Sequence, residues 1–336
     1  MHLFPFLFLG FGILAAESSE LGQDQDPAKP PIITRDPTIT RDPVFTQKPV
    51  SAWIHDLKDQ DPQTRDKALN ALATMGPLAK AARPDLEKLL EETNNPIQIR
   101  TAFALWKIDR QSTAIVPALR VSLKNSDNKL RSQALQCLYQ MGSDGKEAAP
   151  LLLELLGDKD DTVRAQSAQV LMAIGREAVP TLIKGLNHSG VKVRREAADL
   201  LGRIGYFSEK AVPLLTEKLK DDDKLTRFKA AAALWKIQGE WASLLPLWLE
   251  GIKDADVNVR KEILQPVLFQ IQPPPKAALP IFNVGMKEGD LFYRVKAADG
   301  IWEINHQPDQ VLPILLDGLK NGSDPVRAAA LQTLGR

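Results

Sequence analysis

The chain of 336 residues has almost no cysteine and no excess charge of either sign. Its single cysteine, Cys137, excludes a disulfide within the chain and a zinc site built from cysteines. Lysine and arginine number 43 against 42 aspartate and glutamate residues, so no overall positive field exists to attract nucleic-acid phosphates. We therefore expect no nucleic-acid partner, and the composition fits a soluble globular chain.

Residues that would carry catalysis or hold a metal are also scarce. The chain has only 4 histidines, and His55, His188 and His306 lie far apart in the sequence. No glycine-rich phosphate loop precedes a helical pattern, and no serine lies in a nucleophile-elbow context. Cys137 precedes the apolar Leu138 and is best explained as a small buried hydrophobe. We expect no catalytic, cofactor-binding or metal-binding residue.

Long apolar runs are absent apart from one at the N-terminus, from Leu3 to Ala16. The run has the length of a signal-peptide core and is too short for a membrane-spanning helix of about 20 residues. We predict a signal peptide over residues 1–16, export to the periplasm or outside the cell, and no transmembrane segment in the mature chain. The alternatives are a misassigned start, which would leave the protein cytoplasmic, and a retained run that tethers it to a membrane.

Residues 17–49 are rich in Asp, Pro, Thr and Gln, with few apolar residues. Each proline disfavours helical backbone in the residue before it, and the apolar residues are too few to offset the entropy of ordering. We predict a disordered spacer here.

One pattern recurs about every 33 residues from Ser51 to the end of the chain. A marker residue recurs in each unit, and in all units but the first a proline lies 14 residues before it. The marker residues are Arg65, Gln98, Arg131, Arg164, Arg194, Arg227, Arg260, Arg294 and Arg327. The pattern predicts nine repeats.

Each unit contains two stretches with helical periodicity. The first begins near the proline and carries large apolar residues one turn apart, as Leu152 and Leu156 show. The second begins after an aspartate four residues before the marker, as Asp160 precedes Arg164, because aspartate accepts hydrogen bonds from the free N–H groups of a helix start. Small residues then follow the marker and allow neighbouring helices to approach closely.

A helix pair of this length cannot bury its apolar stripe alone, so the pairs must stack into one continuous core. We therefore predict an all-α fold, an α-solenoid forming a right-handed αα superhelix of about nine helix pairs over residues 50–336. Because the sequence stops within the ninth unit without a polar capping repeat, we expect it to be truncated at the C-terminus.

The repeated motif P-x-L-x3-L-x3-D-x3-R-x2-A-A-x2-L-x2-I-G resembles the HEAT repeat, and more closely the short variety named after phycobilisome lyases. The resemblance covers residues 51–336 and implies that the second helices line a concave side. HEAT-like families include chromophore lyases, a DNA glycosylase, an iron-dependent hydroxylase and many scaffolds, so the fold alone does not decide the function. The paired His-Glu motifs of the hydroxylases are absent here.

The recurring charges and tryptophans have structural explanations. We interpret the arginines and aspartates as a ladder that caps the second helices and bridges adjacent repeats. Trp106, Trp235 and Trp302 occur at the same position of their units and are expected to pack between repeats.

Positions two, five and nine after the marker point away from the core, and we assign a partner-binding face to them. Glutamines occupy these positions in the third and fourth units, with basic residues on either side, and the fifth unit adds Glu196 and Asp199. Such amides suit adaptable hydrogen bonding to a polypeptide, although the same face would also serve solubility alone. The assigned residues are Arg100, Phe103, Lys107, Gln133, Gln136, Gln140, Gln166, Gln169, Arg203, Lys229 and Lys236.

These observations favour a non-enzymatic scaffold that holds a protein or peptide on its concave face. The alternative is an enzyme or enzyme adaptor of the chromophore-lyase or glycosylase-like kind, or a fragment whose catalytic domain is missing. Pro266 lies within the second helix of the seventh unit, where it removes a backbone hydrogen bond, and we expect a kink there.

Overall fold

The computed structural model describes residues 42–91, 96–270 and 273–336, which form nine helix pairs. The first helices of the pairs are α1 (Val50–Asp56), α3 (Arg83–Glu91), α5 (Ile115–Leu123), α7 (Ala149–Leu155), α9 (Val179–Gly185), α11 (Val212–Lys218), α13 (Leu245–Gly251), α15 (Leu279–Gly285) and α17 (Pro308–Asn321). The second helices are α2 (Pro62–Met75), α4 (Pro96–Asp109), α6 (Asn128–Met141), α8 (Asp161–Ile174), α10 (Val191–Ile204), α12 (Lys224–Gln238), α14 (Val257–Gln270), α16 (Leu291–Asn305) and α18 (Asp324–Leu334). Short 3₁₀ helices connect many pairs, at η1 (Gly76–Ala82), η2 (Gly142–Ala148), η3 (Gly175–Ala178), η4 (Gly205–Ala211), η5 (Ala242–Leu244) and η6 (Lys276–Ala278). The predicted all-α solenoid is confirmed.

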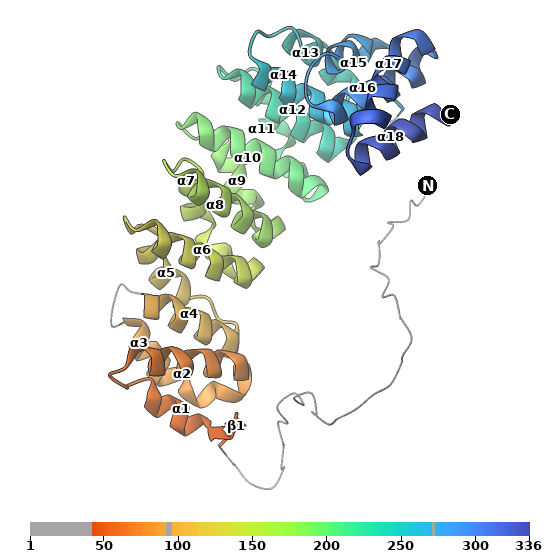
Figure 1. Cartoon of the computed structure of the whole chain (residues 1–336). Coiled ribbons are helices and arrows are strands. Elements are labelled where there is room, and N and C mark those ends of the chain that lie inside the picture. Colours follow the sequence, from red (N-terminus) through yellow and green to blue (C-terminus); the bar gives the residue numbers. More distant parts are fainter. Residues whose placement is uncertain (1–41, 92–95, 271–272) are drawn as a thin grey trace, which may run out of the picture.

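The pairs follow one another along an open arc, and the second helices lie toward its inside (Figure 1). Neighbouring second helices, such as α10 and α12, contact each other more extensively than neighbouring first helices such as α7 and α9. Stacked elements lie closer together on the inside of a curve, so the contacts agree with this arrangement. The second helices therefore provide the inner face of the solenoid.

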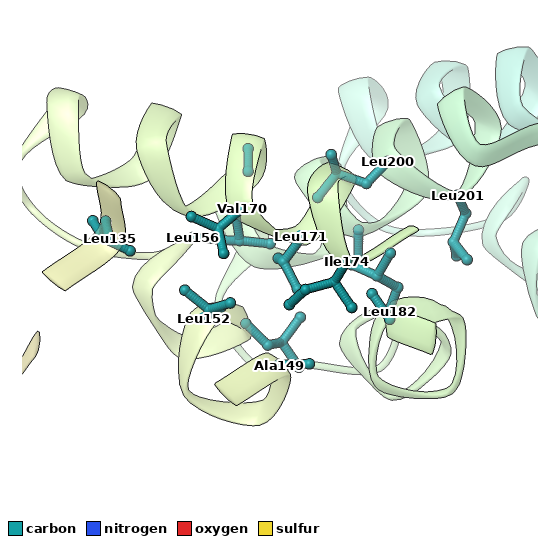
Figure 2. Packing of buried hydrophobic residues seen from close by; sticks show 14 of the residues in the cluster. Leu135, Ala149, Leu152, Leu156, Val170, Leu171, Ile174, Leu182, Leu200 and Leu201 are labelled. Carbon is teal, nitrogen blue, oxygen red and sulfur yellow. The ribbon is translucent and has the colours of Figure 1, made fainter. Parts of the chain in front are cut away.

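Leucine side chains fill the space between the two helix layers and join one pair to the next. Fully buried leucines come from α7 and the residue that follows it, from α8 and from α9, namely Leu152, Leu156, Leu171 and Leu182 (Figure 2). Burial of a leucine side chain contributes roughly 1.5–3 kcal/mol, so each pair depends on its neighbours for its core.

Two acidic residues close the turn inside a helix pair. Asp223 accepts a hydrogen bond of 2.8 Å from the backbone N of Thr226 and so caps α12. Two residues earlier, Asp221 accepts a hydrogen bond of 3.0 Å from the backbone N of Asp223. The expected capping role of the aspartate four residues before the marker is confirmed at Asp61, Asp127, Asp160, Asp223, Asp256 and Asp290.

The recurring arginine ties this turn to the next repeat. Nη1 of Arg194 donates to the carbonyl oxygens of His188 and Ser189, at 3.0 and 3.1 Å. Its Nε and Nη2 each lie 3.0 Å from the carboxylate of Asp221 in the next pair. Arg131 with Asp158 and Arg260 with Glu288 form the same link. The predicted ladder is therefore present in these three repeats, with the correction that the arginine binds the first acidic residue of the turn and not the capping aspartate. Arg164 instead pairs with Asp161 of its own turn, and Arg65 and Arg227 donate only to backbone carbonyl oxygens.

The described chain begins with a short hairpin against the first helix. Strand β1 (Val44–Phe45) pairs with β2 (Lys48–Pro49) in antiparallel orientation. The backbone N of Val50 donates to the carbonyl oxygen of Pro43 at 2.8 Å, and Lys48 forms an ion pair with Asp56 on α1. The prediction of a disordered spacer is therefore wrong for the residues up to 49 that form this hairpin. The predicted signal peptide, residues 1–16, and the spacer up to residue 41 lie outside the described residues.

The helices of the described chain include none that is both long enough and apolar enough to span a membrane.

Helix α14 continues through Pro266 without a break. Ile263, Leu264 and Val267 are buried around it, and Ile263 replaces the alanine, serine or threonine that the other second helices carry at its position. The bend that a proline favours at this point stays a prediction.

Candidate functional site

Contacts between successive helices show that positions two, five and nine share the inner face. Nζ of Lys229 on α12 lies 3.3 Å from Oδ1 of Asp199 on α10 and 2.8 Å from Oε2 of Glu262 on α14. Near the two ends of the arc, an ion pair joins Arg336 to Glu303, both at position nine, and another joins Arg100 at position two to Asp66, one residue after its marker. These ion pairs join the inner faces of neighbouring repeats near both ends and in the middle of the arc.

Five glutamines occupy the middle of this face, and we call them the glutamine floor. The floor consists of Gln133, Gln136 and Gln140 on α6 and Gln166 and Gln169 on α8. Three of these side chains are exposed, and Gln133 and Gln166 are half-buried. Across the described residues, none of the five side-chain amides is hydrogen-bonded to another group of the chain. The floor therefore presents donors and acceptors that the fold itself does not use.

Gln166 is the glutamine of the floor whose side chain most needs a hydrogen-bond partner. Its side-chain oxygen Oε1 is buried and has no hydrogen-bond partner. A buried acceptor without a partner costs roughly 1–3 kcal/mol, because its hydrogen bonds to water have been lost. A donor supplied by a bound segment would remove this cost if the half-buried amide turned its oxygen toward the surface.

Tyr139 on α6 belongs to the same surface, although the sequence pattern did not identify it. Its side chain is 48% exposed and follows Gln136 by one helical turn. In the second unit the equivalent residue is Trp106, which is only 2% exposed. The sequence did offer a signal for Tyr139, because this aromatic residue at position eight precedes Gln140 at position nine, a position assigned to the inner face.

Positive charge adjoins the floor on the side of α4. Arg100 is paired with Asp66, so its charge is largely balanced within the fold. Nζ of Lys107 lies 5.3 Å from the ring centre of Phe103 and 5.1 Å from that of Trp106. Among the described residues Lys107 has no ion-pair partner, so its ammonium group is held over aromatic rings with its charge uncompensated.

On the side of α10 the predicted basic shoulder needs correction. Lys229 is 22% exposed, and burial alone would lower the pKa of its ammonium group, but the carboxylates of Asp199 and Glu262 raise that pKa above its ordinary value. Arg203 lies 3.9 Å from Asp199. Lys229 is therefore part of an internal network and is not free for a partner, whereas Lys236 on α12 keeps its charge unpaired within the described chain.

Glu196 lies within this network without joining it. No hydrogen bond or ion pair reaches its carboxylate from any described residue. Burial raises the pKa of Glu196, and the nearby carboxylates of Asp199 and Glu262 raise it further, against the opposing effect of Lys229. The sequence pattern placed Glu196 on this face but gave no sign that it is unpaired.

Among the described residues, the groups that could supply chemistry do not gather on the inner face. Burial raises the pKa of Cys137 to about 12, so its thiol is not ionised at neutral pH. His188 lies 3.3 Å from Glu154, between neighbouring repeats. Within the described ranges, no three histidine, cysteine or acidic side chains lie close enough together to hold a metal ion.

Several solved structures are similar to this fold. Kap95p, which binds RanGDP, is 13% identical with a TM-score of 0.58 over 85% of this chain and 45% of its own. Kap121p bound to Nup53p is 15% identical with a TM-score of 0.56, over 87% of this chain and 38% of its own. Importin beta is 15% identical with a TM-score of 0.55, over 84% of this chain and 45% of its own. These likenesses show the fold alone, and this chain spans less than half the length of each.

No curated protein matches the sequence. A family model described as HEAT repeats matches residues 83–173, 150–235 and 179–265. These overlapping segments cover more than half of the chain, and they include both helices that form the glutamine floor. The chain therefore belongs to the HEAT-repeat family.

Proposed function

We propose that the protein is a non-enzymatic scaffold whose inner face binds an extended segment of another protein. The observation that carries this proposal is the glutamine floor, where five amide side chains make no hydrogen bond to the chain and one buried oxygen has no partner. An extended polypeptide offers N–H and C=O groups at regular intervals, and a side-chain amide can bind both. The repeat length of about 33 residues supports the short variety of HEAT repeat named after phycobilisome lyases.

Two structural neighbours support the choice of a protein partner. Kap121p is bound to Nup53p and Kap95p binds RanGDP, and both share the stacked architecture. In a solenoid of this kind the inner face is long and continuous, so it suits an extended partner better than a small molecule.

The test is a selection of peptides of about twelve residues from a random display library on the folded chain, a length that spans roughly 40 Å when extended. The triple variant Gln133→Glu, Gln136→Glu and Gln169→Glu loses the N–H donors of three amides, because a carboxylate only accepts hydrogen bonds at neutral pH. We expect it to bind the selected peptides at least about tenfold more weakly, as measured by fluorescence anisotropy.

A matched control makes the same chemical change elsewhere. Gln63, Gln238 and Gln310 are exposed and lie outside the floor, so changing all three to Glu should leave peptide affinity within about twofold. Both variants should keep the circular dichroism of the parent. Equal losses in the two triple variants, or a selection that enriches no peptide at all, would rule out the proposal.

A further inference from the structure

The charges on either side of the glutamine floor differ in sign, and each has an unpaired member. On one side lies Lys107 of α4, and on the other lies Glu196 of α10. Most other charges near these two residues are already paired within the fold. A segment bound between α4 and α10 therefore meets one available cation and one available anion, whereas the unpaired Lys236 lies beyond this stretch on α12.

The side of α4 carries a net positive charge. Arg100 is paired with Asp66, and Arg110 lies 3.9 Å from Asp144, with its guanidinium group 4.2 Å from the centre of the Trp106 ring. These two pairs roughly cancel, which leaves Lys107. The best complement to Lys107 is a carboxylate supplied from outside.

The side of α10 carries a net negative charge. Glu196, Asp199 and Glu262 supply three carboxylates, against the ammonium group of Lys229 and the guanidinium group of Arg203. Lys229 binds Asp199 and Glu262, and Arg203 lies nearest to Asp199. Of the three carboxylates, Glu196 is therefore the one left without a cation. The rise in the pKa of Glu196 is consistent with this lack of a partner.

A diagonal line of glutamines joins the two charges. Lys107 and Gln140 lie nine positions after their markers, and Gln136 and Gln169 lie five positions after theirs. Gln166 and Glu196 lie two positions after their markers. Three helix-to-helix steps of about 8–10 Å, and a shift of about 10 Å along the helix axes, separate the ends by about 26–32 Å. At about 3.3 Å per residue, an extended segment covers this distance with about eight to ten residues. The line runs through Lys107, Gln140, Gln136, Gln169, Gln166 and Glu196.

We propose that the segment bound on the glutamine floor is dipolar, with an acidic side chain at Lys107, a basic side chain at Glu196, and mainly uncharged residues between them. The inference rests on the proposed function, because it specifies the partner of the same face. The extended backbone binds the glutamines, and the two end charges fix the position of the segment along the solenoid.

The experiment repeats the peptide selection on the parent chain and on two charge variants. Peptides selected on the parent should be enriched in an acidic and a basic residue about eight to ten positions apart. The variant Glu196→Lys makes both ends positive, so its peptides should carry acidic residues at both positions. The variant Lys107→Glu makes both ends negative, so its peptides should carry basic residues at both positions.

Affinities of synthetic peptides then provide the second readout. The dipolar peptide should bind the parent at least about tenfold more tightly than a peptide with two acidic ends, and Glu196→Lys should reverse that order. The preference should weaken in high salt, because these charges are partly exposed. Control variants at Lys253, which is exposed next to a first helix, and at Glu303, which lies outside the line, should keep the preference of the parent.

The outcomes separate the two proposals. If peptides are enriched on the floor but show no charge pattern, or show the same pattern on all three proteins, the dipolar partner is wrong and the scaffold remains. If no peptide is enriched on the parent, the proposed function is wrong and the dipolar partner with it.

Discussion

Asp223 shows how a single carboxylate can serve both a helix and a repeat boundary. It accepts hydrogen bonds from the backbone N and the hydroxyl of Thr226, each at 2.8 Å, at the start of α12. It also accepts a hydrogen bond of 2.7 Å from Nε of Arg195, which belongs to the preceding repeat. The hydrogen bond from Arg195 lowers the pKa of Asp223 to about 2, against the opposing effect of burial.

The lowered pKa gives a prediction with a definite sign. An unfolded aspartate has a pKa of about 3.9, so the charged carboxylate stabilises the folded chain above about pH 4 and loses this effect as the pH falls through about 2. Asp223→Asn keeps a capping oxygen but removes the charge, and it should lower the free energy of unfolding at pH 7 by roughly 1 kcal/mol. The urea midpoint, followed by circular dichroism, should converge with that of the parent between about pH 4 and pH 2.

The neighbouring Asp222 provides the control. Its side chain is exposed, so Asp222→Asn should leave the midpoint unchanged at every pH. A difference at pH 7 that persists undiminished at pH 2 would contradict the assigned role of the Asp223 charge.

Pairing between individual charges could not be predicted from the repeat pattern alone. The pattern placed Lys229 correctly on the inner face, but its ion pairs depend on how far α10, α12 and α14 are shifted along one another. The sequence did contain one indication of this ion pair, because Lys229 and Glu262 have opposite charge at the same position of successive units. The absence of a partner at Glu196 depends on the whole network and has no local signature.

At the scale of elements, several second helices end at a glycine with an unusual backbone. Gly76, Gly142, Gly175 and Gly205 have φ between 55 and 68° and ψ between −129 and −134°. Side chains with a Cβ rarely adopt this conformation, so glycine allows the chain to turn directly into the 3₁₀ helix that follows. Ile-Gly or Met-Gly at the end of a unit therefore marks the end of the second helix.

Gly205→Asn tests this requirement. A Cβ at Gly205 would meet no atom within 4 Å, so any loss of stability comes from the backbone and not from crowding. We expect the free energy of unfolding to fall by roughly 1–3 kcal/mol. The measurement is again the urea midpoint.

Gly239→Asn is the matched control, since a Cβ there also has open space around it. Gly239 has φ 75° and ψ −3°, close to the left-handed region that asparagine tolerates. Its substitution should cost less than about 1 kcal/mol. Equal effects at the two glycines would show that ψ does not matter at Gly205.

The helices were predictable because their signals are local and repeated. A capping aspartate, a proline and a terminal glycine lie within a few residues of the boundaries that they set. The hairpin at residues 44–49 carries no such repeated signal, and its ion pair from Lys48 reaches forward to Asp56 on α1. The sequence offered proline and polar residues there, which are typical of a spacer as well as of a turn.

At the scale of the whole molecule, stability should be distributed along the solenoid in one dimension. Each pair shares its buried side chains mainly with the pairs before and after it, and the described chain has no core that joins distant repeats. Such stacks lose structure near a damaged repeat before they lose it elsewhere. The dipolar partner of the inner face would span α4 to α10, so its binding should protect that part of the stack most.

Leu201→Ala tests the one-dimensional behaviour directly. Leu201 on α10 is fully buried and lies in the core shown in Figure 2, and its truncation should cost roughly 2–5 kcal/mol through lost contacts and a residual cavity. Because α10 packs on α9 and α12, hydrogen exchange should speed up first in these helices, while α2 and α18 keep the protection of the parent. The control Leu331→Ala removes a side chain that is 60% exposed on α18 and should leave exchange in the central repeats unchanged. A uniform loss of protection over all nine pairs of the described chain would instead mean that the solenoid unfolds as one cooperative unit, and the stack could not then be treated as a series of neighbouring repeats.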